Sequence, residues 1–395
     1  MPKKLVITCL INFLIAALLG LALRYTYIFP ISFNYRFLTH AHSHIAMLGW
    51  VYLMIFTLYV HYFIPDKKPI YNKLFWITEI AVIGMLLSFP FQGYAVVSIT
   101  FSTLHIFCSY YFARLIWKNH QTDSMVTQYL VKASLIFMVV STLGVWVLGP
   151  AVGILGQASA FYQIAIQFFL HFQFNGWFLI AVIVVLFHKL QLKYSKDFRL
   201  FFKLLVISTI LTFALPINWF VPHISLLWIN GLGVLLQLAS LFLFIKLIKQ
   251  PLKSMIATSS KIIRFMLRFA LFCFVLKIAS QSVSLIPEIS NTAFQHKNLV
   301  IGFIHLTMLG VISGFLFSYI LQSNLVTQNR NLNIGMAIFV IGFILTELII
   351  ISQGFMFYFG IGLLPNYYLL LFISSILLPL GIVSLIFNIY RTRLL

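Results

Sequence analysis

Two segments far apart in the chain share one histidine motif. His44-Ile-Ala-Met-Leu-Gly and His305-Leu-Thr-Met-Leu-Gly both read His-x-x-Met-Leu-Gly, and each lies near the start of a long apolar run. Haem iron accepts one neutral imidazole on each axial face, so two helices that each offer a histidine can hold a six-coordinate haem. Glycine and methionine are common in membrane helices, which leaves an accidental repeat as the alternative. The motif predicts a low-spin haem b with His44 and His305 as axial ligands.

Two further histidines precede His44 in the segment His40-Ala-His42-Ser-His44. At helical spacing His40 and His44 share a face while His42 points elsewhere, so the three cannot all bind one iron. Thr39 is a candidate N-cap, which would place His40 and His42 in the first helical turn near water. For these two residues we expect either an interfacial contact with the haem propionates or no role. A transition-metal site at the outer surface is a further alternative for the cluster.

A polar stripe lies in a later apolar run. Its members are four residues apart and therefore share a helical face: Gln163, Gln167, His171 and Asn175. Polar side chains face lipid only at high cost, so the stripe points into the bundle or a water-filled cavity. The glutamines favour hydrogen bonds between helices. His171 is open to either role: the same structural one, or a second metal centre, with copper as the metal and His105 or His223 as partners.

The composition shows which elements must position these residues. Of the 395 residues, 8% are charged and 62% are hydrophobic, and the mean hydropathy is +1.04. A soluble domain carries about 25% charged residues, so the solvent of this chain must be lipid. Long apolar runs with short polar segments between them indicate an all-α bundle of membrane helices. The net charge of +20 does not indicate nucleic-acid binding, because the basic residues fall in alternate loops.

About twelve membrane spans are expected, each near the roughly 20 residues that cross a bilayer. They cover about 5–29, 41–64, 72–90, 93–116, 130–149, 160–188, 201–220, 223–247, 264–286, 298–321, 333–354 and 366–389. The longest loops are 188–200 and 248–263. Residues 1–395 therefore form a single polytopic membrane domain. The basic clusters fall on one side, and the positive-inside rule then predicts that both termini are cytoplasmic: Lys3/Lys4, Lys67/Lys68/Lys73, Lys118/Lys132, Lys189/Lys193/Lys196/Arg199, Lys246/Lys249/Lys253/Lys261/Arg264, Arg330 and Arg391/Arg393.

This topology gives the two motif histidines a common setting. Spans two and ten both run from outside to inside, so His44 and His305 are expected at similar depth on parallel helices. Three ionisable residues, Glu79, Lys277 and Glu347, lie inside spans. Each would cost about 2.5–3.5 kcal/mol at a helix centre, so each is expected to have a partner or a cavity. Lys277 and Gln281 share a face, and both a lysine–glutamate pair and a proton path are consistent with the pattern.

Twelve spans with histidines at the outer ends of spans two and ten resemble the haem–copper oxidase subunit I superfamily, and the cbb3-type subunit most of all. The resemblance covers the topology of the whole chain but only two segments in motif. It implies that His44 and His305 ligate the low-spin haem. The chain departs from the family at Phe303, where the high-spin haem ligand is expected, and in span seven, which has no His-His pair for copper. Span six also departs from the family, because its sequence there is His171-Phe-Gln-Phe-Asn-Gly-Trp. The resemblance therefore implies an oxidoreductase with an incomplete or remodelled oxygen-reducing centre.

His40-Ala-His42 followed by Met-Leu-Gly is also similar to the early histidine motif of NnrS, a haem-containing membrane protein associated with resistance to nitric oxide. A twelve-span transporter without haem is the alternative from another class, although the repeat relates spans two and ten and does not fit a six-plus-six duplication. A third alternative is an assembly or haem-handling partner of a respiratory complex. The expected partners are the lipid bilayer, other respiratory subunits and a small electron-donor protein or quinol. The expected location is the bacterial cytoplasmic membrane.

Overall fold

The computed structural model describes residues 1–392, and this part of the chain consists of helices joined by turns and loops, with no strand. Eleven of its helical segments are long and apolar enough to cross a membrane. The prediction of an all-α integral membrane protein in contact with lipid is thus confirmed. The expected ninth span forms helix α13 (Lys261–Val283) but is not one of these eleven. The count of twelve and the cytoplasmic termini stay predictions, and Arg393 lies outside the described residues.

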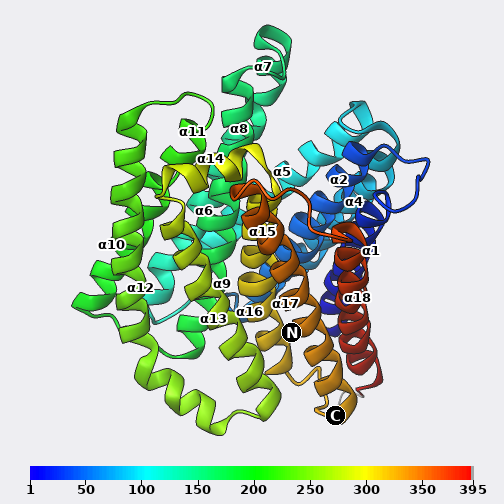
Figure 1. Cartoon of the computed structure of the whole chain (residues 1–395). Helices are drawn as coiled ribbons and strands as arrows, with labels where there is room; N and C mark the ends of the chain where they lie inside the picture. Colours follow the sequence, from blue (N-terminus) through cyan, green and yellow to red (C-terminus); the bar gives the residue numbers. More distant parts are fainter. Residues whose placement is uncertain (393–395) are drawn as a thin grey trace. The chain divides into compact units, whose positions relative to one another are not determined.

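The internal contacts divide the chain into two units. Figure 1 shows the helices of both with their labels. The first unit comprises Met1–His120, Lys261–Leu267 and Ser313–Leu395. Its helices are α1 (Lys3–Tyr25), α2 (Tyr35–His44), the π-helix η1 (Ile45–Tyr52), α3 (Leu53–Phe63), α4 (Pro69–Gln92), α5 (Val96–Asn119), α16 (Gly314–Leu321), α17 (Arg330–Tyr358) and α18 (Tyr367–Arg391). The single membrane domain expected from the sequence stays a prediction.

The second unit comprises Gln121–Ser260 and Arg268–Ile312, and it contains most of α13. Its other helices are α6 (Met125–Trp146), α7 (Leu148–Leu155), α8 (Ala160–His171), the π-helix η2 (Phe172–Phe178), α9 (Leu179–Lys189), α10 (Lys196–Leu211), α11 (Ala214–Asn218), α12 (Ile224–Thr258), α14 (Pro287–Gln295), α15 (Asn298–His305) and the π-helix η3 (Leu306–Ser313), whose last residue belongs to the first unit.

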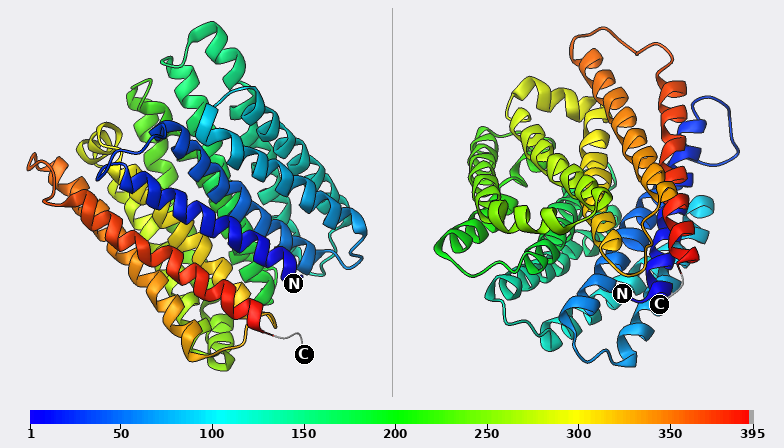
Figure 2. Two further views of the ribbon diagram at one scale, coloured as in Figure 1. Left: turned by 90° about the vertical axis from the view of Figure 1, so that its right-hand side faces the viewer. Right: turned by 90° about the horizontal axis from the view of Figure 1, so that it is seen from below.

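In the first unit, the first and last helices of the chain lie side by side. Figure 2 shows α1 in blue next to α18 in red, and the two helices are in contact along their lengths. The Lys3 ammonium donates hydrogen bonds to the carbonyls of Tyr390 and Thr392 at 3.2 and 2.7 Å. α1 also packs on α2 and η1, which carry the first histidine motif. The amino-terminal helix therefore supports that motif directly.

Span two begins earlier than the sequence predicts. The N-cap of α2 is Asn34, whose side-chain oxygen accepts hydrogen bonds from the backbone amides of Arg36 and Phe37 at 2.9 and 3.2 Å. The prediction of Thr39 as N-cap is wrong, because Thr39 lies inside the helix and its hydroxyl donates to the Tyr35 carbonyl. A side-chain acceptor can satisfy the free amides of a first turn from Asn34 as well as from threonine. His40 therefore lies in the second turn of α2, not in the first.

In the second unit, α12 continues for 35 residues through Pro251 to Thr258. The predicted loop over 248–263 is therefore wrong for most of its length, and only Ser259 and Ser260 separate α12 from α13. Lysine favours the helix almost as well as leucine does, so a basic segment can extend a membrane helix beyond its apolar part. The positive charge of this segment indicated contact with water, which is not the same as loop structure.

Candidate functional site

Three histidines each end an α-helical segment that continues as a π-helix. His44 ends α2 before η1, His171 ends α8 before η2, and His305 ends α15 before η3. Short π-helical turns are rare and occur frequently at functional sites, because they change the register of side chains on a helix. Their hydrogen-bond pattern joins residues five apart. That is the separation of each histidine from a glycine of its own segment: Gly49, Gly176 and Gly310.

The sequence motif did not include one of these three histidines, His171. The segment after His171 has Phe174 and Asn175 where the segment after His44 has Met47 and Leu48. A motif defined by Met-Leu-Gly therefore excludes it. The shorter pattern His-x-x-x-x-Gly finds all three segments, and it is the signal that matches the π-helices.

The His44 ring has a defined tautomer. Its Nδ1 lies 2.8 Å from the His40 carbonyl oxygen, which can only accept, so Nδ1 carries the proton. Its Nε2 lies 3.1 Å from the Tyr94 hydroxyl, which must then donate to the Nε2 lone pair. The ring also packs against Phe89, with centroids 4.4 Å apart. His44 therefore presents an unprotonated nitrogen, which is the atom that a metal ion or haem iron binds.

The three histidines of α2 divide between two surroundings, as their spacing predicts. The His40 ring lies 6.5 Å from that of His44 and 4.6 Å from that of Tyr94, between centroids. His42 instead contacts α1, where its Nδ1 donates to the Ala16 carbonyl at 2.8 Å. The His42 ring lies over Gly20, at which a Cβ atom would come within 2.9 Å of the ring. Within residues 1–392 no group of three or more His, Cys, Asp or Glu side chains is placed to hold a metal ion.

A buried polar cluster supports η1 from two neighbouring helices. The Asn12 amide nitrogen in α1 donates to the Gly49 carbonyl at 3.1 Å and to the Glu79 carboxyl oxygen Oε2 at 2.8 Å. Asn12 and Glu79 are 3% and 5% exposed. One amide thus bridges a π-helical carbonyl and the side chain of α4, and Glu79 has the buried partner that an ionisable group in a membrane requires.

Trp50 adds to the support of η1. Its indole N–H donates to the Ser313 hydroxyl at 2.9 Å. Its ring stacks on Phe13 of α1 with centroids 4.7 Å apart. Met47 is buried as well. Hydrogen bonds and ring packing therefore hold η1 in place, so the segment that follows His44 is fixed by its neighbours.

A buried lysine lies in the same unit as the His305 segment and precedes it in the chain. Lys277 of α13 is completely buried and donates to the Gln281 side-chain oxygen at 2.7 Å, so these two residues share a face as expected. Its ammonium lies 5.6 Å from the centroid of the Phe303 ring. Phe303 thus faces a cation at the position where the family resemblance places a haem ligand. His305 is half-buried, two residues further along α15.

His171 engages the opposite ring nitrogen from His44. Its Nε2 lies 2.7 Å from the Thr209 carbonyl, so Nε2 carries the proton and the ring links α8 to α10. His223 is the N-cap of α12, and its Nδ1 accepts a hydrogen bond from the Ser225 amide at 3.2 Å. His105 lies in the other unit, where its ring meets the Tyr52 ring edge-on at 4.7 Å. The second metal centre at these histidines stays a prediction. The contact with Thr209 links two helices and uses only one ring nitrogen, so it leaves both roles of His171 open.

The polar stripe changes register at η2. Gln163 and Gln167 lie on α8 and are half-buried, while Asn175 lies in η2 and is buried. The Gln163 amide donates at 2.9 Å to the carbonyl of Gln157, which lies in the connection between α7 and α8. Contact with another helix is made by Gln173, which accepts from the Ser141 hydroxyl of α6 at 2.8 Å. Gln173, which the stripe did not include, therefore contacts α6 from within η2.

No protein-family model matches the chain, and no curated protein matches its sequence. The resemblance to haem–copper oxidase subunit I and to NnrS therefore stays an expectation from two motifs and a topology. The first unit offers one histidine with a fixed tautomer, whose lone pair accepts a hydrogen bond from Tyr94, and a π-helix supported by α1 and α4. A matching histidine precedes η3 in the second unit.

Proposed function

We propose that this chain is a haem b-binding redox protein of a membrane. His44 would hold the haem iron, together with His305, which the sequence repeat assigns as the second ligand. The observation that carries the proposal is the tautomer of His44, in which Nδ1 donates to the His40 carbonyl and Nε2 keeps its lone pair. Histidines that ligate metals generally donate their other ring N–H to a carbonyl or carboxylate, which fixes the ring orientation.

The surroundings of His44 fit this group. The Tyr94 hydroxyl hydrogen-bonds to the Nε2 lone pair, but its side chain is 50% exposed and can rotate away without leaving a buried gap. Phe89 offers an apolar ring beside the imidazole. Haem bound here supplies a one-electron carrier, whose potential depends on its ligands and on burial. His44 would hold the iron, while the His40 carbonyl orients the imidazole and Asn12 and Trp50 keep the following helix in place.

The proposal places the protein in the cytoplasmic membrane of a bacterium as part of electron transport. Its departures from the oxidase pattern, at Phe303 above all, favour a role without a complete oxygen-reducing centre. The contact between Phe303 and the Lys277 ammonium supports this reading, because a phenylalanine ring cannot ligate iron. Chemistry of nitric-oxide stress and assembly with respiratory subunits belong to the same proposal.

The test is an optical spectrum of the purified full-length protein, oxidised and dithionite-reduced, with a pyridine haemochrome assay. We expect about one haem b for each chain and a six-coordinate low-spin spectrum. His44→Ala and His305→Ala should each remove the low-spin spectrum. His42→Ala is the matched control, because His42 belongs to the same helix but donates to α1.

Two results would overturn the proposal. A colourless protein from haem-replete cells would show that the histidines serve another purpose and would favour the transporter alternative. Loss of the low-spin spectrum in His42→Ala but not in His44→Ala would show that the ligand is His42 and that the assignment to His44 is wrong. Copper analysis of the wild type and of His171→Ala tests the second centre in the same preparations.

A further inference from the structure

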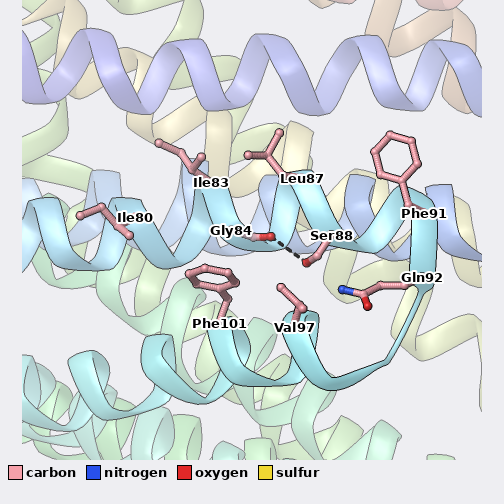
Figure 3. A pocket seen from close by; sticks show the side chains of 9 residues that line it. All are labelled: Ile80, Ile83, Gly84, Leu87, Ser88, Phe91, Gln92, Val97 and Phe101. Carbon is pink, nitrogen blue, oxygen red and sulfur yellow. Dashed lines mark hydrogen bonds between the residues drawn. The ribbon is translucent and has the colours of Figure 1, made fainter.

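A polar pocket lies in the first unit between the start of α17 and the end of α18. It has a volume of about 230 Å³, which is enough for a small polar group but less than most sites for drug-sized molecules. Polar side chains make up most of its lining: Thr327, Asn329, Asn331, Ser384, Asn388 and Thr392. The apolar groove between α4 and α5, shown in Figure 3, has no charged side chain in its lining. The pocket at α17 and α18 differs from that groove, because it offers hydrogen bonds and the charge of Arg391.

Asn388 of α18 carries a buried acceptor without a donor. The residue lines the pocket and is 6% exposed, and within residues 1–392 its amide oxygen Oδ1 has no hydrogen-bond partner. Buried polar atoms in folded proteins are paired with few exceptions, so each exception requires an explanation. A ligand that donates a hydrogen bond from a hydroxyl group would supply the missing partner.

The charge around the pocket favours an anion. The Arg391 guanidinium belongs to the lining and lies 4.2 Å from the centroid of the Phe387 ring. The first turn of α17 lines the pocket with Asn331, and the free amides of a helix N-terminus favour negative charge. The Lys3 ammonium is close by, since it donates to the Thr392 carbonyl at 2.7 Å. None of the described residues that line the pocket is acidic, so an anion would meet positive charge without competition from a carboxylate.

Hydrogen bonds hold the loop before α17 against the end of α18. The Thr392 hydroxyl accepts from the Thr327 amide at 3.1 Å and donates to the Asn388 carbonyl at 2.9 Å. The Asn329 side chain caps α17 and accepts from the Leu332 amide at 2.9 Å. A ligand therefore meets polar groups that are already in position, which lowers the cost of binding.

An apolar stripe leads away from the pocket along α18. Both α17 and α18 are long and apolar enough to cross a membrane, and the pocket lies at their ends, where the bilayer surface is expected. Phe387 lines the pocket and is 51% exposed, and Val383 and Leu380 of the preceding turns are exposed too. Residues three and four apart share a helical face, so these three side chains form one stripe toward the bilayer centre. Acyl chains can pack along this stripe, whereas a free phosphate ester would leave it unused.

We propose that the pocket between α17 and α18 binds the headgroup of an anionic phospholipid that carries hydroxyl groups, as phosphatidylglycerol does. The Arg391 guanidinium binds the phosphate, a headgroup hydroxyl donates to Asn388 Oδ1, and the acyl chains follow the stripe from Phe387. Other headgroups fit less well, because the ammonium of phosphatidylethanolamine would lie among cations and phosphatidylcholine has no donor. This inference goes beyond the proposed redox function and does not require haem.

The test is native mass spectrometry of the purified full-length protein in detergent, titrated with phosphatidylglycerol, phosphatidylethanolamine or phosphatidylcholine of the same acyl chains. We expect one tightly bound phosphatidylglycerol for each chain, and at least about tenfold weaker binding of the other two lipids. Arg391→Gln should weaken phosphatidylglycerol binding at least about tenfold, and Asn388→Leu about threefold to tenfold through loss of the acceptor. Leucine leaves no unpaired acceptor at this position, so Asn388→Leu should fold as well as the wild type does.

Arg199→Gln is the matched control, because Arg199 is an exposed arginine in the first turn of α10 and does not line the pocket. It should bind lipid as the wild type does. Equal affinity for the three lipids, or unchanged phosphatidylglycerol binding in both Arg391→Gln and Asn388→Leu, would overturn the inference.

Titration with glycerol phosphate separates the two sources of a phosphate ester. If it displaced phosphatidylglycerol at similar concentrations, the pocket would belong to a soluble ligand and the lipid assignment would be wrong. The same lipid titration on His44→Ala should match the wild type, since the pocket shares no residue with the candidate haem site. The lipid result and the haem spectrum can therefore fail independently of each other.

Discussion

The Tyr94 hydroxyl donates to Nε2 of His44 across 3.1 Å, and so occupies the lone pair that an axial ligand must use. His44 ends α2, and Tyr94 lies in the short connection between α4 and α5. Haem binding at His44 therefore competes with this hydrogen bond. Haem bound at His44, as proposed, would require the phenol to turn away first.

Replacement of Tyr94 by phenylalanine should therefore increase the affinity for haem. A hydrogen bond of this kind contributes about 0.5–1.5 kcal/mol, so Tyr94→Phe should lower the dissociation constant by a factor of up to about ten. The measurement is a haem titration of the haem-free protein followed by its absorption. Tyr111→Phe, an exposed tyrosine of α5, is the control and should change nothing. Loss of the low-spin spectrum in Tyr94→Phe would instead show that the phenol helps to hold the haem.

Replacement of Gly49 by alanine should destabilise the first unit. A Cβ atom at Gly49 would come within 2.9 Å of Val82 Cγ1 and 3.0 Å of Asn12 Cβ, both in buried surroundings. Such overpacking costs about 1–3 kcal/mol, and the thermal midpoint measured by circular dichroism in detergent should fall. Gly231→Ala in α12 is the control, because no atom lies within 4 Å of its Cβ position. That variant should be unchanged or slightly stabilised, since alanine favours the helix. An equal loss in both variants would refute the steric explanation.

The histidine face of α2 was predictable because it depends only on local periodicity. Residues four apart share a helical face, so His40 and His44 were expected together and His42 apart, and the structure confirms both. Apolar runs likewise located the helices, since crossing a bilayer needs a long apolar segment and nothing else in the chain supplies one. Helix ends were less certain because several polar residues can cap a first turn, as Asn34 does in place of Thr39.

Other features depend on contacts between distant residues. The hydrogen bond from Tyr94 to His44 joins residues 50 positions apart, and no spacing rule contains it. The same is true of the amide of Asn12, which meets Gly49 and Glu79. A stripe defined by steps of four also missed Gln173, which lies in η2 and contacts α6. The continuation of α12 beyond residue 247 was missed because lysines were taken to indicate a loop.

The Asn12 cluster predicts unequal costs for two substitutions. Asn12→Ala removes the donor shared by the Gly49 carbonyl and Glu79, which leaves two buried acceptors without this partner. Each lost bond of this kind costs about 1–3 kcal/mol, so the thermal midpoint should fall clearly. Glu79→Gln keeps a side-chain oxygen that Asn12 can donate to, and it should have little effect. If Glu79→Gln destabilised the protein as much as Asn12→Ala, the negative charge of Glu79 would be needed and the amide bond alone would not explain the cluster.

Replacement of His105 by phenylalanine should stabilise the protein, unless the residue binds a metal. The His105 side chain is 4% exposed, and within residues 1–392 its Nε2 has no hydrogen-bond partner. A buried polar atom of this kind costs about 1–3 kcal/mol, which phenylalanine avoids while keeping the edge-on contact with Tyr52. His171→Phe is the matched control and should destabilise, because it removes the bond to the Thr209 carbonyl. Thermal unfolding of both variants, with copper analysis of the same samples, separates the possibilities. A fall in the midpoint of His105→Phe together with loss of bound copper would show that Nε2 of His105 is a ligand, and that its lack of a hydrogen bond reflects this role.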